Sequence, residues 1–198
     1  MKDLNDLEKK RILVGTSSGI AIYKICSLVR LFLKHGAAVK VVMTENATKL
    51  VSPLTFQSLT QSPVYVSMFN PVDPDKIEHI HLAEWADIFV IAPATANTIA
   101  KMVNGISDNL LTTVTLALSE ETPIVVVPAM NDNMWKNVFV QENIEKLRKR
   151  KNCHIVKPVR GKLASGKVGE GRMVEIDEIF ETARKVLLNQ KRVKDEIR

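Results

Sequence analysis

The stretch RILVGTSSGIAIYKICSLVRLFLKHGAAVKVVMT, residues 11–44, decides the fold. Its first part, RILVGTS (11–17), is an apolar run of the kind found in buried strands. The segment 19–36 then places apolar side chains at helical spacing and stops at Gly36, a common residue at helix ends. A second apolar run, AVKVVMT (38–44), follows. The stretch therefore predicts a strand, a helix and a second strand parallel to the first.

The rest of the chain repeats this alternation. Further apolar runs predict strands over 87–93, 123–130 and 153–158. Helical patterns lie between and after them, at 46–52, 52–60, 96–105, 109–118, 137–151 and 176–190. Near-continuous apolar strands separated by helices are typical of a parallel sheet covered on both faces. We therefore expect an α/β fold, Rossmann-like and of the flavodoxin type, with helices flanking both faces of the sheet.

Length and composition indicate one domain over residues 1–190, followed by a charged tail at 191–198. The first ten residues are charged, and no apolar run approaches the ~20 residues that span a bilayer, so we expect no membrane partner. Two cysteines, Cys26 and Cys153, favour a reduced compartment, and we expect a cytoplasmic protein. The net charge of +6 gathers in late helical segments without a recognition motif, so we expect no nucleic-acid partner.

In such folds ligands bind at the carboxyl ends of the strands. The first of these ends, GTSSGIAIYK (15–24), offers the N–H groups of a helix start and the hydroxyls of Ser17 and Ser18, which favour a phosphate. The second strand ends at Thr44, where an Asp or Glu would hold the ribose of a dinucleotide. This pattern fits a mononucleotide such as FMN better than NAD.

Two other interpretations of residues 15–24 stay open at this point. GTSSG matches the G-x-S-x-G nucleophile elbow, although that fold places several strands before the elbow and only fourteen residues precede Gly15. An ordinary capped turn between strand and helix is the other.

Two further strand ends carry polar groups. APATANT (92–98) opens a helix with hydroxyl and amide side chains and gives the predicted phosphate site a second wall. In PAMNDNMW (128–135), Asn131 is placed to donate an amide hydrogen bond, while capping of a helix by Asn131 or Asp132 is the simpler interpretation.

The segment EHIHLAEWAD (78–87) holds two histidines, His79 and His81. They would share a face on a strand and diverge on a helix. No neighbouring His, Cys or carboxylate completes a metal-binding spacing, so we expect no metal. The glycine-rich stretch KLASGKVGEGRM (162–173) is either a spacer or a flap over a ligand.

Together these segments carry a resemblance. GTSSGIAIYK, HIHLAEWADIFVIAPATANTIAK, NGISDNLLTT, PAMNDNMW and ASGKVGEGRM occur in the order in which they occur in the flavin-dependent cysteine decarboxylases. The chain resembles this family, which includes phosphopantothenoylcysteine decarboxylase and the peptidyl-cysteine decarboxylases of lantibiotic synthesis, from about residue 10 to 187. The PxMNxxMW pattern is its most specific motif.

The resemblance implies FMN bound between the subunits of a homotrimer, in some members assembled into a dodecamer. His79 falls on the family's catalytic histidine, and Asn131 on the asparagine that holds the substrate carboxylate. Met134, Ala164 and Ser165 fall on the substrate side. The residues implied at the cofactor, together with the hydroxyl of Ser17, are Ser18, Gly19, Ile20, Thr44, Thr95, Ala96, Asn97 and Thr98.

The family's chemistry explains these residue types. A hydride passes from the cysteine Cβ to the flavin as the thiol loses its proton, and the resulting thioaldehyde accepts the electrons released when CO₂ departs as an enethiolate forms. A neutral His79 suits the role of base near neutral pH. Asn131 orients the carboxylate without adding a charge that would retain it.

At one position the chain departs from the family. In the coenzyme A branch, a cysteine in an A-C-G-x-x-G-x-G-R-M loop supplies the last proton, and this chain has Ser165 there. We therefore expect the loop to be a flap and the final reduction to be impaired. The alternatives are another proton donor, an engineered replacement of cysteine, or release of the enethiol, as in the peptidyl enzymes.

Two other function classes fit the sequence less well. A non-catalytic phosphatase regulator of the same fold is disfavoured by the presence of His79. A flavin prenyltransferase is disfavoured by PxMNxxMW. Because the coenzyme A enzyme is often fused to a synthetase domain, the tail at 191–198 is a candidate for the start of a linker.

Overall fold

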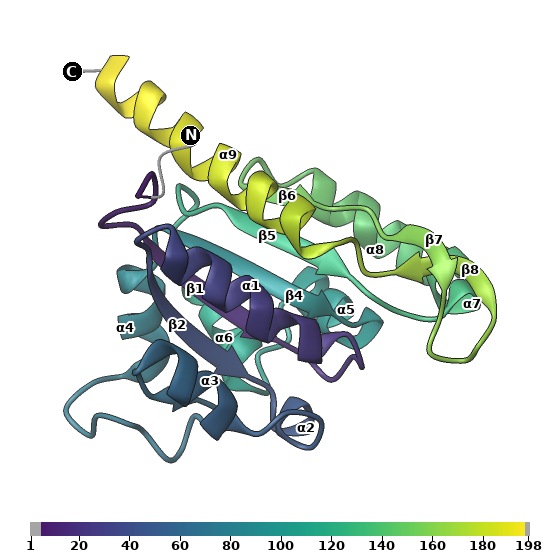
Figure 1. The fold of residues 1–198 in the computed structure, drawn as a ribbon, viewed down its shortest axis with the longest axis horizontal. Coiled ribbons are helices and arrows are strands. Elements are labelled where there is room, and N and C mark those ends of the chain that lie inside the picture. The colour runs from purple at the N-terminus through teal and green to yellow at the C-terminus, as the bar shows by residue number, and fades with distance from the viewer. Residues whose placement is uncertain (1–4, 197–198) are drawn as a thin grey trace.

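The computed structural model describes residues 5–196, with side chains through residue 189. Its centre is a six-stranded sheet in the order β3-β2-β1-β4-β5-β6, and every pair of neighbouring strands is parallel (Figure 1). The strands are β1 (Arg11–Thr16), β2 (Ala38–Met43), β3 (Val64–Tyr65), β4 (Ile88–Ala94), β5 (Ile124–Pro128) and β6 (Cys153–Ile155). The predicted α/β class is confirmed.

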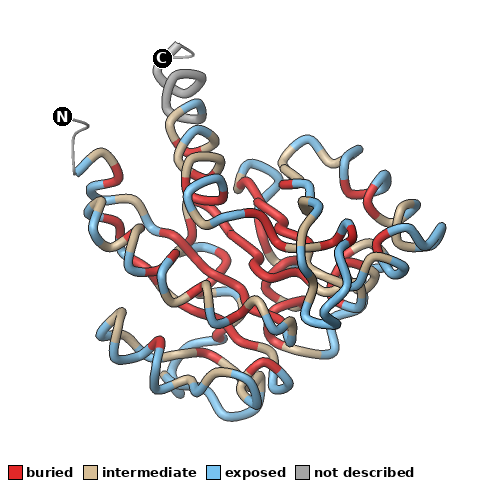
Figure 2. Tube along the Cα trace, turned by 45° about the vertical axis from the view of Figure 1, so that its right-hand side comes forward, coloured by how far each residue is buried: buried red, intermediate tan, exposed pale blue. Residues whose placement is uncertain are grey.

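Helices cover both faces of the sheet, as predicted. One face packs against α1 (Ile22–Lys34), α2 (Glu45–Thr48), α3 (Pro53–Thr60) and α9 (Ile176–Glu196). The other packs against α4 (Glu78–Trp85), α5 (Ala96–Asn104), α6 (Leu110–Ala117), α7 (Asp132–Lys136) and α8 (Val138–Arg148). Figure 2 shows the consequence, a buried sheet inside a shell of half-buried and exposed helices.

The central strand shows why these runs are apolar throughout. Along β1, Ile12 and Val14 enter the core on one face while Leu13 enters the core on the other, and all three are fully buried. Side chains of successive strand residues point to opposite faces, so a strand with two covered faces has no polar position. Burial of each side chain of this size stabilises the folded state by about 1.5–3 kcal/mol relative to leaving it exposed.

Three details differ from the sequence-based expectation. The edge strand β3 was not predicted, because two residues carry no periodic signal; without it, the remaining strands have the flavodoxin order. The stretch 162–173 is part of an antiparallel hairpin of β7 (Val159–Lys162) and β8 (Val168–Arg172). The helix α9 continues to Glu196, so most of the predicted tail at 191–198 is helical, and its role as a linker stays a prediction.

No helix within the described part of the chain is both long and apolar enough to cross a membrane. Within the same residues, no three His, Cys, Asp or Glu side chains gather closely enough to hold a metal ion.

Candidate functional site

Two cavities lie at the carboxyl ends of β1 and β4. These strands are neighbours, but the chain leaves β1 toward β2 and leaves β4 toward β5, so a crevice opens between the two connections. The larger cavity has a volume of about 610 Å³ and the smaller about 240 Å³. Both are lined by Ser18 and Thr95, so they meet at this crevice.

Most of the predicted site residues line these cavities. The larger one takes in Ser18, Gly19, Ile20, Thr95, Ala96, Asn131, Met134, Ala164 and Ser165. The smaller one takes in Ser17, Ser18, Thr44, Thr95, Asn97 and Thr98. Segments from four strand ends and the hairpin therefore converge on one place. His79 lines neither cavity.

Ser17 joins the two segments that form the predicted phosphate site, called the cradle here: residues 17–21 after β1 and residues 95–98 after β4. Its hydroxyl donates to the Pro93 carbonyl at 2.7 Å, and the Thr95 N–H donates to the same hydroxyl oxygen at 3.0 Å. Only 1% of Ser17 is exposed. A buried hydroxyl committed to a carbonyl is a poor nucleophile, so the elbow interpretation of GTSSG fails, and Ser17 supports the site rather than presenting its hydroxyl to it.

The turn from β1 into α1 leaves backbone donors free. Gly19 N–H and Ile22 N–H are bonded within the turn, whereas the N–H groups of Ser18, Ile20 and Ala21 have no partner among the described residues. No side chain caps α1. Unpaired N–H groups at the start of a helix attract an anion such as a phosphate.

Gly19 fits this turn closely. A Cβ atom there would lie 3.2 Å from Pro93 Cγ. Gly19→Asp is therefore expected to remove bound flavin, because the side chain is crowded and its charge repels a phosphate at the free N–H groups. Flavin absorbance per purified chain measures this. Gly105→Asp, where φ is +67° and a Cβ meets nothing within 4 Å, is the control for backbone strain and added charge away from the cradle, and it is expected to keep its flavin. Full flavin content in Gly19→Asp would refute the position of the cradle.

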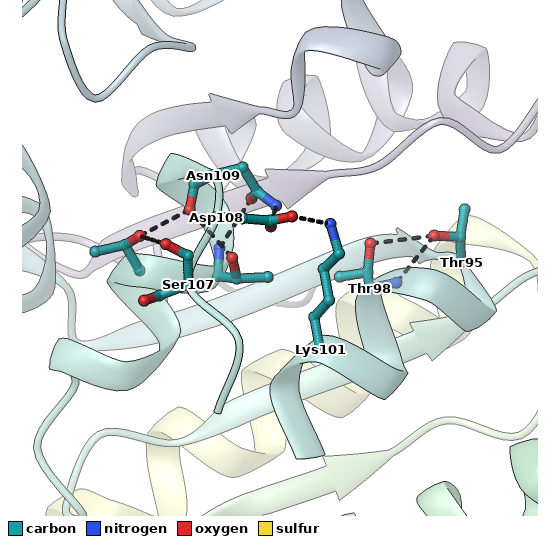
Figure 3. Close-up of polar contacts among 8 residues, drawn as sticks. Thr95, Thr98, Lys101, Ser107, Asp108 and Asn109 are labelled. Carbon is teal, nitrogen blue, oxygen red and sulfur yellow. Dashed lines mark hydrogen bonds and ion pairs between the residues drawn. The ribbon is translucent and has the colours of Figure 1, made fainter. Parts of the chain in front are cut away.

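A network of polar side chains lines the smaller cavity, and Figure 3 shows its contacts. Thr95 caps α5 by accepting from Thr98 N–H at 3.3 Å, and Lys101, one turn further on, pairs with Asp108 at 2.6 Å. Asn109 donates to the other Asp108 oxygen at 2.9 Å and caps α6. The bond from Lys101 holds the pKa of Asp108 below its usual range. The network fixes the 105–109 segment beside α5.

Sequence reasoning identified the block NGISDNL but assigned no role to Lys101, Asp108 or Asn109. Lys101 could have been found, because it lies three residues after Thr98 and so shares its helix face. The contact of Lys101 with Asp108 joins separate segments, and no local pattern signals it.

Asn131 caps a helix with its side-chain oxygen and keeps its amide N–H groups available for a ligand. Its Oδ1 accepts from Asn133 N–H at 2.9 Å and so begins α7. Its NH₂ group has no partner among the described side chains and backbone, and the residue lines the larger cavity. The two interpretations of Asn131 are therefore compatible, because capping uses the oxygen and leaves the amide donors available.

The hairpin of β7 and β8 is hydrogen-bonded to the turn between β5 and α7, residues 129–132, which we call the Asn131 turn. Met130 N–H donates to Gly171 O at 2.9 Å, and Glu170 N–H donates to Asp132 Oδ1 at 2.8 Å. Bonds from Lys136 and from Glu170 N–H lower the pKa of Asp132, which keeps this anchor ionised. The stretch 162–173 thus extends over the larger cavity from a fixed base, as a flap does and a spacer does not.

Gly171 allows this close contact. Its φ is +119°, and a Cβ there would lie 2.4 Å from Met130 O. Gly171→Ala is expected to destabilise the protein by about 3 kcal/mol or more, because strain and a backbone clash add. Gly166→Ala, with φ +81° and open space around the Cβ position, is expected to cost only about 1–2 kcal/mol. Thermal unfolding at one fixed protein concentration compares the stability of the two variants. Equal losses of stability would contradict the contact of the hairpin with Met130.

Ser165 lies in the turn of this hairpin, exposed at the edge of the larger cavity. The cysteines of the chain lie elsewhere: neither Cys26 nor Cys153 lines either cavity. Burial raises the pKa of Cys153 to about 11. No thiol among the described residues therefore takes the place that Ser165 occupies.

The two histidines lie on helix α4, not on a strand, and they differ in their surroundings. His81 Nε2 lies 3.1 Å from Lys40 Nζ, and burial followed by the Lys40 charge lowers the pKa of His81. His79 is half-buried, and its ring has no polar partner within residues 5–189. Of the two, His79 is the one free to act on a ligand.

Comparison with known proteins agrees with this geometry. Residues 1–188 match the family model described as Flavoprotein. The chain is 45% identical over 179 residues to the coenzyme A biosynthesis bifunctional protein CoaBC of Bacillus subtilis (strain 168), covering 90% of this chain and 43% of that protein. The chain thus spans less than half the length of this bifunctional relative.

A shorter relative matches over nearly its full length. The chain is 41% identical over 172 residues to a probable phosphopantothenoylcysteine decarboxylase of Streptococcus mutans serotype c (strain ATCC 700610 / UA159), covering 87% of this chain and 96% of that protein. A solved cysteine-to-serine mutant of PPC decarboxylase, complexed with pantothenoylaminoethenethiol, superposes with a TM-score of 0.79 at 34% identity, covering 89% of this chain and 97% of that one.

These matches extend across the β1–α1 cradle, the Asn131 turn and the hairpin. They confirm the family resemblance predicted from the five sequence blocks. The chain belongs to the Flavoprotein family, the family of the phosphopantothenoylcysteine decarboxylases that it resembles.

Proposed function

We propose that this chain is a cytoplasmic, FMN-dependent carboxy-lyase that decarboxylates 4′-phosphopantothenoylcysteine toward 4′-phosphopantetheine in coenzyme A biosynthesis. The similarity to CoaBC and to phosphopantothenoylcysteine decarboxylase supports the substrate. The observation that carries the proposal is the Asn131 turn, which is held under a docked flap at a cavity formed by the ends of β1 and β4.

The residues present fit FMN. The free N–H groups of Ser18, Ile20 and Ala21 form one phosphate cradle, and Gly19 leaves room for it. Thr44, the first residue after β2, caps α2 and lines the smaller cavity. The position that holds a ribose carboxylate in dinucleotide-binding folds therefore carries a hydroxyl here. FMN, when bound, supplies the hydride acceptor for oxidation of the cysteine.

The remaining residues position the substrate. The NH₂ group of Asn131 donates to the substrate carboxylate and orients it for loss of CO₂. Met134 and Ala164 give the cavity apolar surface near this end, and Ser165 covers it from the flap.

His79 can take part in the site only if it comes from a second copy of the chain. Its free ring lies outside both cavities, and the segment around it exposes apolar side chains: Ile77 is 66% exposed and Phe69, in the preceding loop, is 85% exposed. Large apolar side chains exposed in one segment are typical of an interface between subunits. We propose a homotrimer, alone or within a dodecamer, with each site shared between copies.

A second candidate function is a peptidyl-cysteine decarboxylase that releases an enethiol. Ser165 favours it, because such an enzyme needs no flap acid. The solved cysteine-to-serine relative that holds pantothenoylaminoethenethiol equally supports a coenzyme A enzyme that stops at the enethiol. The phosphatase-regulator alternative would require that the site hold flavin without releasing CO₂.

One experiment separates these functions. The purified protein, with its flavin content read from the visible spectrum, is incubated with 4′-phosphopantothenoylcysteine or with a peptide ending in cysteine, and CO₂ is measured. We expect CO₂ from the first substrate only. CO₂ from the peptide alone would establish the second candidate, and no CO₂ from either would overturn the decarboxylase.

A further inference from the structure

The larger cavity carries a one-sided charge. Three cationic side chains line it, Lys24, Lys162 and Arg172, and its lining within the described chain includes no Asp or Glu. A cavity with cations and no carboxylate favours an anionic ligand. Part of this charge suits the FMN phosphate proposed at the N–H groups of Ser18, Ile20 and Ala21, which line the same cavity just before Lys24. The two cations of the hairpin, Lys162 and Arg172, are additional.

The three cations are not equivalent. Lys24 Nζ lies 3.4 Å from Glu175, and Arg172 pairs with the same carboxylate. Lys162 is exposed, and its ammonium group has no ion pair or hydrogen bond with any other described residue. Lys162 is therefore the cation of this cavity that remains available for a ligand.

The hairpin sets the position of Lys162 relative to the Asn131 turn. The contacts with that turn run from Gly171, which accepts from Met130 N–H, to Gly169, where a Cβ would lie 2.7 Å from Asp132 Cβ. Lys162 pairs in register with Val168, the next residue toward the tip. Val168 lies three positions from Gly171, about 10 Å at ~3.3 Å per residue, and one position from Gly169. Asn131 and Lys162 both line the cavity. A ligand that pairs with the Asn131 amide and with the Lys162 ammonium therefore has an anionic group for each.

The proposed substrate has this form. Its carboxylate and its phosphate lie at opposite ends of a chain about as long as four peptide residues, or ~14 Å when extended. The flexible stem of the lysine covers the remaining distance. We infer that Lys162 binds the terminal phosphate monoester and so selects a phosphorylated small substrate over an unphosphorylated one or a peptide. This inference rests on the proposed function.

The test compares pairs of ligands that differ only in the phosphate. Binding of 4′-phosphopantetheine and pantetheine is measured by calorimetry with the flavin-loaded protein. Single-turnover CO₂ release from 4′-phosphopantothenoylcysteine and pantothenoylcysteine gives the kinetic counterpart. Lys162→Gln is expected to raise the Kd of the phosphorylated ligands about 10–100-fold, the range of a charge-assisted hydrogen bond. The Kd of the unphosphorylated ligands should change less than about twofold.

Two variants serve as controls. Lys162→Arg keeps the charge and is expected to retain most of the preference for phosphate. Lys167→Gln removes the same charge from the same hairpin, at a side chain that does not line the cavity, and should leave the preference unchanged.

The outcomes distinguish this inference from the proposed function. Equal loss for both members of a pair in Lys162→Gln, or no preference for phosphate in the unaltered protein, would overturn the role of Lys162 while decarboxylation stands. An equal effect of Lys167→Gln would reduce the role to general attraction by the flap and also overturn it. Absence of CO₂ from every substrate would instead refute the decarboxylase.

Discussion

Replacing Ser165 by cysteine is expected to change the product of this chain from an enethiol to saturated 4′-phosphopantetheine. The unaltered chain should release about one CO₂ per site and then stop, since neither oxidation nor loss of CO₂ requires an acid on the flap. Return of the hydride requires a proton as well. A thiol with a pKa near ~8.5 delivers that proton far more readily than a serine hydroxyl.

The structure sharpens this expectation. Ser165 lies on the flap at the cavity edge, and neither Cys26 nor Cys153 lines a cavity, so no other thiol among the described residues can substitute. Mass spectrometry separates the two products, which differ by two hydrogen atoms. Turnover by Ser165→Cys should exceed that of the unaltered chain by about a hundredfold or more, the contribution of one positioned acid.

Ser165→Ala is the matched control. It should behave as the unaltered chain does, because a hydroxyl that delivers no proton can be removed without loss. Saturated product from the unaltered chain would contradict the prediction. The phenol of Tyr23, which lines the same cavity, would then be the next donor to test, through Tyr23→Phe. An enethiol product that persists in Ser165→Cys would favour the peptidyl-decarboxylase function.

His79→Asn and Asn131→Asp are each expected to lower CO₂ release at least about a hundredfold while flavin is retained. The first removes the base, and the second sets a carboxylate against that of the substrate. Neither should unfold the chain. Asp is as good a helix cap as Asn, so α7 keeps its start, and the His79 ring has no polar partner among the described residues.

Mixing the two inactive variants tests the shared site. If each site takes His79 from one copy and Asn131 from another, random assembly of equal amounts leaves about a quarter of the sites intact, and activity returns. A site built from one chain would give no recovery. The control is a mixture of unaltered chain with the double variant: about a quarter of the sites should be active if shared, and about half if not. A flavin-loaded monomer in light scattering would also contradict the shared site.

The sequence by itself determined the layers of this protein and the ends of its strands. Runs such as RILVGTS are apolar at every position because both faces of β1 are covered, and that signal is local. Parallel connections then require the carboxyl ends of β1, β4 and β5 to meet at one edge. Ser18, Thr95 and Asn131 can therefore be assigned to one site from the sequence alone.

Tertiary structure decided how these groups are used. Position 171 must be a glycine because the backbone of Met130, forty-one residues earlier, occupies the space of a Cβ atom. Lys101 donates to Asp108, which lies on the segment after the helix. Lys162 is positioned by the register of a hairpin whose strands are too short and too rich in glycine to show a hydrophobic period. Contacts between distant segments depend on packing in three dimensions, so residue patterns that repeat over a few positions cannot report them. For the same reason, only the folded chain shows that His79 lies apart from the cavities that Asn131 and Ser165 line.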